Sequence, residues 1–462
     1  MNSGKREMQW LKKAYPIKHN EIMENNWMSY VDSGKASDEK ILKAWVSKVP
    51  GSLAPVHLIV STIQAMRNKG YDVKEAELLI DDGLKAIESK NFGELQIITS
   101  KIYKALNDAK KDNLSDYWNY EVFSCWEDIE KSVKFPDKEK VNFEEISLEE
   151  RIKAAWYAKL IGGAIGTQLE GYLTENIQEV FGIVDYYLRE PETYNDDITY
   201  EIAFLDAYHK YGKNITSNEV AFSWLELIME GYSAEEVALS NLRRGIYPPY
   251  SGTNQNYFSD WIGAQMRTSI HGMLSPGNPK EAARLAVIDS LVSHFNNGMI
   301  GGMFNAILLS LAFVEKDMKK LVLKVVDLLP KKSEYYKYAM QGVNSVLNSD
   351  SWQEAWDKNS SIMEEYSWMH SYPNVIAEII ALWYGDNDFN KTASIISTIG
   401  LDSDCNAAPV LSTLAVAYGM DIIDKKWLEP FDGTIKTVMR RYREVHIDYL
   451  IKMTVESIIE NS

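Results

Sequence analysis

Cysteine is scarce in this sequence, whose 462 residues contain only Cys125 and Cys405. Two thiols so far apart exclude a disulfide framework and a zinc site built from clustered thiolates. A chain with so few thiols is suited to a reducing compartment. We therefore expect a cytoplasmic protein.

An excess of positive charge is also missing, because 66 Asp and Glu residues outnumber 49 Lys and Arg residues and give a net charge of -17. This balance argues against a general nucleic-acid or membrane-binding protein, which needs a basic face. The most apolar stretch, from Met299 to Val314, is shorter than a membrane span and predicts a buried core helix. The first thirty residues lack the continuous apolar core of a secretory signal, so no export is implied.

Runs of short alternating strands are absent too, and helical periodicity is found instead. Amphipathic patterns with apolar spacings of three and four fill the chain from about residue 38 to 133. Ser147, followed three residues later by Glu150, has the pattern of a helix start. Further helical patterns occur at about 199–211, 216–231, 234–243, 279–293, 299–315, 318–328, 352–364, 373–383, 389–398 and 406–419. The sequence therefore predicts an all-α fold.

The chain is longer than one hydrophobic core usually organises, so either one large domain with an appendage or two domains are expected. The stretch 134–147 begins with charged residues around Pro136 and has no helical period, as is typical of a domain boundary. We predict a smaller helical N-terminal region over residues 1–140 and a larger helical domain over residues 147–462. A possible role of the N-terminal region is to recognise a protein partner.

Two carboxylate clusters each precede an apolar helical segment. The first is Asn195-Asp196-Asp197, before the segment 199–205, and the second is Gly400-Leu401-Asp402-Ser403-Asp404-Cys405, before 406–417. Helix capping is the simplest explanation, since these side chains accept hydrogen bonds from free backbone N–H groups. One cap, however, needs only one such residue.

Four carboxylates that met in a partly buried site would repel one another and have raised pKa values. A pair of divalent cations would relieve this repulsion, and Mg²⁺ or Mn²⁺ prefers carboxylate and carbonyl oxygens. Two such ions about 3.5–4 Å apart can orient a water molecule and polarise a leaving oxygen in hydrolysis. The sequence alone leaves open whether the two clusters meet.

These clusters, in this order, resemble the Thr-Asp-Asp-Thr and Gly-x-Asp-x-Asp-Thr elements of the ADP-ribosylglycohydrolase family, which has an all-α fold. The resemblance covers roughly residues 147–425. It implies a binuclear site of two divalent cations, and the residues expected to bind them are Asn195, Asp196, Asp197, Asp402 and Asp404.

Three weaker elements also resemble the family. The glycine-rich helix end from Gly162 to Gly166, followed by Glu170, is similar to the family's stretch that carries a mobile active-site Glu. Glycines at a helix end also serve helix packing or a C-cap, which is the alternative for Gly166.

The stretch Gly263-Ala264-Gln265-Met266-Arg267 is similar to the family's Gly-x-x-Met-Arg element, whose backbone amides would receive substrate phosphates. Ser293-His294 resembles a Thr-His pair beside the substrate ribose, although a lone His is as often a structural hydrogen-bonding residue. The resemblance thus implies Glu170 and Asp197 as catalytic residues. The substrate-binding residues that it implies are Gly166, Gly263, Ala264, Gln265 and His294.

Several positions depart from the family pattern. Asn195 replaces the first Thr and keeps an oxygen ligand, whereas Ile198 replaces a hydroxyl residue and can coordinate nothing. Cys405 replaces the last Thr, and its thiol suits softer ions such as Mn²⁺ better than Mg²⁺. Gly163 stands where many relatives have Asp. These departures bear on substrate specificity more than on metal-dependent hydrolysis.

The resemblance therefore implies a metal-dependent hydrolase that cleaves a glycosidic bond, through nitrogen or oxygen, of a small or protein-linked ADP-ribosyl or related ribosyl compound. One alternative is hydrolysis of a smaller nucleoside-like ribosyl compound. Another is a catalytically weak ADP-ribose-binding protein.

Overall fold

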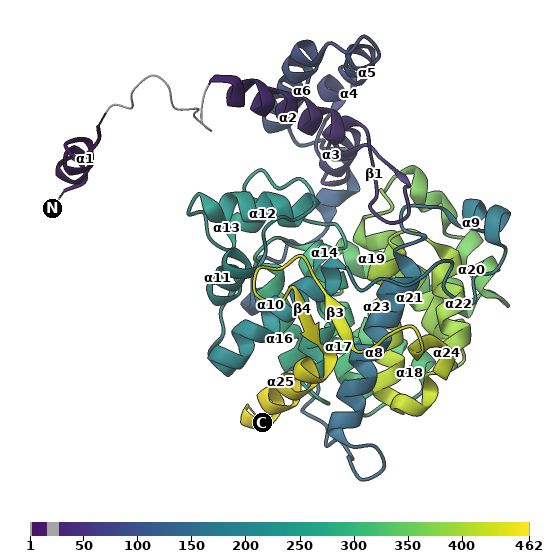
Figure 1. Cartoon of the computed structure of the whole chain (residues 1–462). Helices are drawn as coiled ribbons and strands as arrows, with labels where there is room; N and C mark the ends of the chain where they lie inside the picture. Colours follow the sequence, from purple (N-terminus) through teal and green to yellow (C-terminus); the bar gives the residue numbers. More distant parts are fainter. Residues whose placement is uncertain (1, 16–26, 462) are drawn as a thin grey trace.

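The computed structural model describes residues 2–15 and 27–461, and helices make up most of the described chain (Figure 1). The prediction of an all-α fold is confirmed. The described residues form two small antiparallel sheets of two strands each. These pair β1 (Ser47–Lys48) with β2 (Pro55–Val56), and β3 (Thr434–Lys436) with β4 (Glu444–His446).

The N-terminal helices form a smaller unit above the larger body in the view of Figure 1. They are α2 (Trp27–Trp45), α3 (Leu58–Asn68), α4 (Lys74–Glu77), α5 (Ile80–Glu88), α6 (Phe92–Asn107) and the 3-10 helix η1 (Asp116–Asn119). Helix α1 (Ser3–Leu11) precedes them in the chain and has no buried residue. Trp45 is fully buried at the centre of this unit, and its indole N–H donates to the Thr99 hydroxyl at 2.8 Å. Gly83 leaves room for this ring, since a Cβ there would lie 2.0 Å from it.

The larger body contains the remaining helices. They are α7 (Trp126–Ser132), α8 (Leu148–Gly166), α9 (Thr174–Phe181), α10 (Asp196–Tyr211), η2 (Gly212–Asn214), α11 (Ser217–Leu227), α12 (Ser233–Arg243), α13 (Tyr250–Thr253), α14 (Gly263–Met266), α15 (Ser269–Met273), α16 (Pro279–Ser290), α17 (Asn297–Ala312), α18 (Met318–Asp327), α19 (Glu334–Leu347), α20 (Trp352–Asp357), η3 (Ser360–Glu364), α21 (Ser371–Tyr384), α22 (Phe389–Ile399), α23 (Ser403–Tyr418), η4 (Met420–Ile422), α24 (Lys425–Leu428) and α25 (Ile447–Glu460).

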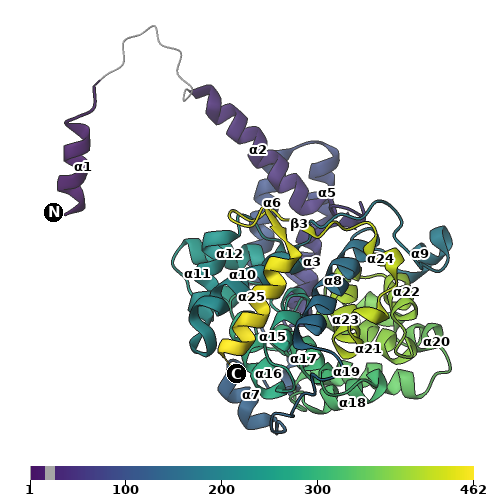
Figure 2. The same cartoon turned by 60° about the horizontal axis from the view of Figure 1, so that its bottom comes forward.

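Helices α8, α17 and α23 lie in the interior of this body (Figure 2). Every residue of α17 is buried, and so are all but one residue of α23 and most residues of α8. A helix that is apolar around its whole circumference must be covered on all sides. The prediction of a buried core helix at Met299–Val314 is therefore confirmed. No helix in the described part of the chain is long and apolar enough to cross a membrane.

The stretch between α7 and α8 has no helix, and Ser147 caps α8 by accepting a hydrogen bond from the backbone N–H of Glu150 at 3.1 Å. Helix α7 itself packs in the larger body, because its Ile129 and the flanking Phe123 and Val133 belong to the core of that body. The smaller core is formed mainly by residues between Trp45 and Leu106. Along the chain, the change from the smaller core to the larger core therefore comes before α7. The domain boundary predicted at 134–147 stays a prediction.

A buried histidine provides a test of the larger core. The ring of His271 is fully buried, packs edge-on against Phe204 with centroids 4.1 Å apart, and its Nδ1 lies 3.1 Å from the carbonyl oxygen of Thr268. Burial, helped by the charge of Arg267, lowers the pKa of His271 from 6.5 to about 3. Between these two pKa values, the unfolded chain protonates the His271 ring, whereas the folded protein keeps it neutral.

We expect acidification from pH 7.5 to pH 5 to destabilise the wild type through His271 by about 2 kcal/mol, because only the unfolded state is protonated between the two pKa values. His271→Asn should be less stable at pH 7.5 and should lose about 2 kcal/mol less on acidification. Urea unfolding at both pH values measures this difference. Parallel losses in the two proteins would contradict the assignment.

Candidate functional site

The two carboxylate clusters lie at the N-termini of α10 and α23, and one hydrogen bond links them. Asn195 caps α10, because its side-chain oxygen accepts from the backbone N–H of Ile198 at 3.4 Å. Its side-chain amide donates to a carboxylate oxygen of Asp404 at 3.2 Å. Segments about two hundred residues apart in the sequence therefore meet in one place.

Helix α8 brings a third segment to the same place through two glycines. A Cβ on Gly162 would lie 2.5 Å from the backbone nitrogen of Ala408, and one on Gly166 would lie 2.1 Å from that of Asp404. The Ser403 hydroxyl closes this contact by donating to the carbonyl oxygen of Gly166 at 2.8 Å. The backbones of α8 and α23 touch where the two helices cross, because neither glycine has a side chain.

The residues that follow this crossing face the carboxylates. The Thr167 hydroxyl lies 2.7 Å from the carbonyl oxygen of Gly163 and 3.4 Å from a carboxylate oxygen of Asp404. Two backbone hydrogen bonds hold the Glu170 turn: the N–H of Gly171 donates to Leu401, and that of Leu401 donates to Tyr172. The turn that carries Glu170 is thus fixed to the loop that carries Asp402.

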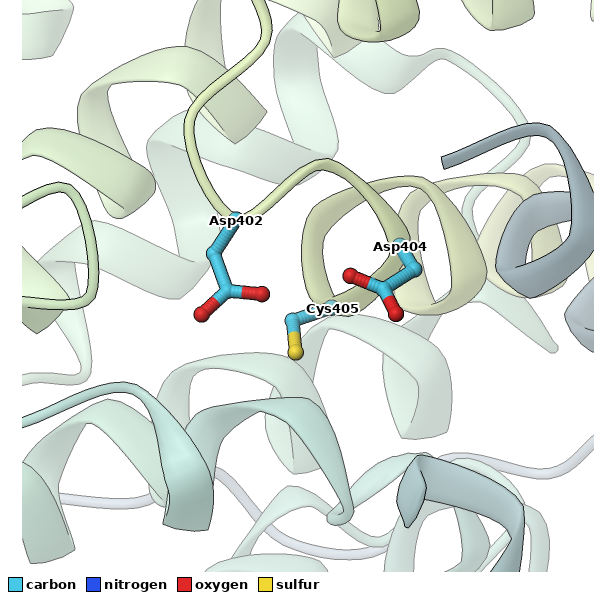
Figure 3. A group of neighbouring side chains, drawn as sticks. All are labelled: Asp402, Asp404 and Cys405. Carbon is cyan, nitrogen blue, oxygen red and sulfur yellow. The ribbon is translucent and has the colours of Figure 1, made fainter. Parts of the chain in front are cut away.

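Asp402, Asp404 and Cys405 form the second cluster at close range. Each offers one ligand atom, and these atoms lie within 4.8 Å of one another. Figure 3 shows the Cys405 side chain between the two carboxylates, on the first turn of α23. The Cys405 sulfur also lies 3.5 Å from the sulfur of Met266.

Burial and mutual repulsion raise the pKa values of these acids. Burial is the first cause throughout; the charge of Asp196 acts next on Asp404, whose pKa rises to about 6. The pKa values of Asp402 and Glu170 rise well above their ordinary range, each with Asp404 as the next cause. Burial also raises the pKa of the Cys405 thiol, which keeps it protonated at neutral pH.

A buried ion pair that the sequence analysis missed stands behind Asp197. The ammonium group of Lys159 lies 3.1 Å from a carboxylate oxygen of Glu201, and both side chains are fully buried. Burial raises the pKa of Asp197 well above its usual range, and the charge of Lys159 opposes this. The sequence signal for this pair was that Lys159 and Glu201 are charged residues within apolar helical segments.

Several carboxylate oxygens of the cluster are buried without a hydrogen-bond partner. They are both oxygens of Asp197 and one oxygen each of Asp402 and Asp404. Buried oxygens without donors are costly and rare in native proteins. A divalent cation would satisfy them, because hard ions bind several carboxylate oxygens. The donor set therefore fits the predicted metal centre.

A cavity of about 330 Å³ opens beside the carboxylates. Glu170, Asn195, Asp196 and Asp404 line it, whereas Asp197 and Asp402 lie buried outside its lining. Four aromatic side chains that the sequence analysis missed form much of its wall: Tyr194, Tyr200, Tyr232 and Trp368. Such rings can stack on a planar ring of a ligand. The cavity combines acidic and aromatic groups.

Other residues predicted to bind substrate do not line this cavity. Gly166 lies in the contact between α8 and α23, and Gly263, Ala264 and Gln265 are buried in α14. The Gln265 side chain donates to Glu378 at 2.8 Å and accepts from the Tyr335 hydroxyl at 2.8 Å. The structure thus places these four residues in packing and hydrogen bonding.

Arg267 and His294 lie behind the cavity wall. Arg267 is buried, forms ion pairs with Glu235 at 2.8 Å and Asp289 at 2.7 Å, and lies 5.4 Å from the ring of Tyr200, which lines the cavity. The ring of His294 is fully buried and bonds to the neighbouring hydroxyl of Ser293 at 2.8 Å. Burial keeps the pKa of His294 well below 6.5, so this ring is neutral.

Two departures from the family pattern contact each other. A Cβ on Gly163 would lie 3.1 Å from the side-chain nitrogen of Asn195, so these positions share one space. Ile198 is 1% exposed and belongs to the main core. Its side chain therefore contributes packing rather than a ligand.

The fold and the site together define an all-α protein with a buried carboxylate cluster beside an acidic and aromatic cavity. A sequence model described as ADP-ribosylglycohydrolase matches residues 144–455. The chain therefore belongs to the ADP-ribosylglycohydrolase family.

Two proteins similar to this chain can be named. An uncharacterized protein of Archaeoglobus fulgidus is 24% identical over 328 residues, which make up 66% of this chain and 100% of that protein. Among solved structures, an ADP-ribosylglycohydrolase-related protein complex matches 68% of this chain and 99% of its own, with 18% identity and a TM-score of 0.49.

The contact between α8 and α23 yields a second prediction. Gly166→Ala should destabilise the protein by about 1–3 kcal/mol, because the added Cβ would collide with the backbone of α23. Gly93→Ala is the matched control, since Gly93 lies exposed in α6 with no atom nearer than 3.8 Å to an added Cβ. The control should be stabilised by up to about 1 kcal/mol. Urea unfolding of both variants decides, and equal effects would refute the steric argument.

Proposed function

We propose that this protein is a metal-dependent hydrolase that cleaves the glycosidic bond of an ADP-ribosyl or related ribosyl compound. Family membership supports hydrolysis of this type. The observation that carries the proposal is the set of buried, unpartnered carboxylate oxygens of Asp197, Asp402 and Asp404 beside the cavity. Asn195 and Asp196 complete the proposed ligands.

The proposed reaction adds water across the bond between the anomeric carbon and the leaving nitrogen or oxygen atom. Bound Mg²⁺ or Mn²⁺ would supply Lewis acidity and lower the pKa of a water molecule. Glu170 or Asp197 accepts the proton of the attacking water, and the leaving atom receives a proton as the bond breaks. The surrounding carboxylates stabilise the positive charge that develops at the anomeric carbon.

Turnover assays distinguish the candidate substrates. The full chain is incubated with Mn²⁺ or Mg²⁺ and either an ADP-ribosylated substrate or a nucleoside, and released products are separated by chromatography. We expect metal-dependent release of ADP-ribose. Cleavage of the nucleoside alone would favour a smaller substrate, and ADP-ribose binding without any turnover would favour a binding protein.

Asp404→Asn tests the proposed ligand role. The substitution keeps the shape but removes one negative charge, so we expect turnover to fall by at least about 100-fold and metal affinity to drop. Stability without metal should stay constant or rise, since a repelling carboxylate is removed. Asp137→Asn, at an exposed position between α7 and α8, is the control and should behave as wild type. Full activity of Asp404→Asn at saturating Mg²⁺ would remove Asp404 from the site.

Cys405→Thr tests the choice of metal. Cys405 lies within 4.8 Å of the ligand atoms of Asp402 and Asp404, so a hydroxyl there should shift the preference from Mn²⁺ toward Mg²⁺. Activity is measured for both proteins over a series of Mg²⁺ and Mn²⁺ concentrations. Superimposable curves would mean that Cys405 acts only as a small packed residue, as buried cysteines often do.

A further inference from the structure

A hairpin of the N-terminal unit reaches into the larger body and forms part of the cavity wall. Strands β1 and β2 are joined by a loop that is closed by hydrogen bonds from the N–H of Val49 to the carbonyl of Ala54 at 2.9 Å and from the N–H of Leu53 to that of Val49 at 3.0 Å. Figure 1 shows β1 where the N-terminal helices meet the larger body. Lys48, Val49 and Pro50 line the cavity that contains Glu170 and Asp404.

The hairpin is seated on the segment that carries Glu170. At one end, Gly51 packs so closely that a Cβ would lie 2.6 Å from the methyl group of Thr167. At the other end, a Cβ on Gly171 would lie 2.8 Å from that of Ala54. Between them, the Tyr172 hydroxyl donates to the carbonyl oxygen of Ser52 at 3.2 Å.

An apolar cluster completes this seat. Val49, Ala54 and Val56 are buried together against Tyr172 and Trp368. Trp368 also lines the cavity, so the hairpin and the aromatic wall are one packed unit. Contacts at both ends and in the middle fix the hairpin, and its position is therefore part of the site's geometry.

Lys48 has a special place in this cavity. Glu170, Asp196, Glu230 and Asp404 contribute negative charge to the lining, and Lys48 is the only Lys or Arg among the described lining residues. Its side chain is exposed and forms no ion pair or hydrogen bond with another described residue. The ammonium group is therefore available to a ligand.

We propose that the β1–β2 hairpin is part of the substrate site and that Lys48 binds a phosphate group of the ligand. This inference rests on the proposed function, because the ligand class is a phosphate-bearing ribosyl compound. A cavity lined by carboxylates repels anions, and a lysine is a point charge that binds phosphate through charge-assisted hydrogen bonds. Residues 47–56 lie outside the matched range 144–455, so this contact is a property of this chain's own N-terminal unit.

Binding measurements with the full chain test this role of Lys48. Isothermal titration in the presence of Mn²⁺ compares ADP-ribose with adenosine, which has no phosphate. We expect Lys48→Ala to weaken ADP-ribose binding about tenfold, which is the loss of one charge-assisted hydrogen bond, and to leave adenosine binding unchanged. Lys48→Arg should restore most of the affinity, and Lys43→Ala, at an exposed position in α2, should match wild type.

Salt dependence provides a second readout. The affinity of wild type for ADP-ribose should fall more steeply with salt than that of Lys48→Ala, since the variant has lost one screened charge contact. Equal ADP-ribose affinities of wild type and Lys48→Ala would overturn the inference. So would an equal loss of adenosine binding, because that would mean a displaced hairpin.

The outcomes separate this inference from the proposed function. Turnover that is unaffected by Lys48→Ala, together with unchanged affinity, would overturn the role of Lys48 and leave the hydrolase intact. ADP-ribose binding that depends on Lys48 without turnover would overturn the hydrolase and support the role of Lys48. A wild type that binds no ADP-ribose would overturn the role of Lys48.

Discussion

The architecture of the site depends on the backbone contact between α8 and α23. Gly162 and Gly166 have no side chains, so the two helices approach more closely than any larger residue would allow. This contact sets the position of Thr167 beside Asp404 and of the Glu170 turn beside the Asp402 loop. The family-like glycines therefore act through packing, and this packing sets the positions of the acidic groups.

The free-energy cost of burying several carboxylates close together is the second constraint on the site. Buried carboxylates repel one another and raise each other's pKa values, and Lys159 offsets this cost next to Asp197. Lys159 is itself paired with Glu201, so its positive charge acts on two buried carboxylates. The remaining unpartnered oxygens are what a bound cation would satisfy.

Part of this arrangement could be predicted from sequence. The helices were predictable because apolar spacing reports a buried face, and the Asp clusters were recognisable because several acids precede one helix. The roles of Lys159, Lys48 and Trp368 could not be predicted, since they arise from contacts between distant segments. For Lys159 the sequence showed only a charge within an apolar helical segment. Gly263, Ala264 and Gln265 matched a motif, but sequence could not reveal that they are buried away from the cavity.

The seating of the β1–β2 hairpin has a consequence for how this chain is divided. A polypeptide limited to residues 144–455 would lack one wall of the cavity and would leave Tyr172 and part of Trp368 uncovered. It would also lose Phe123, Ile129 and Val133 from the core of the larger body. Residues 144–455, which match the family model, are therefore only part of the folded unit that surrounds the site, because that unit also includes residues before 144.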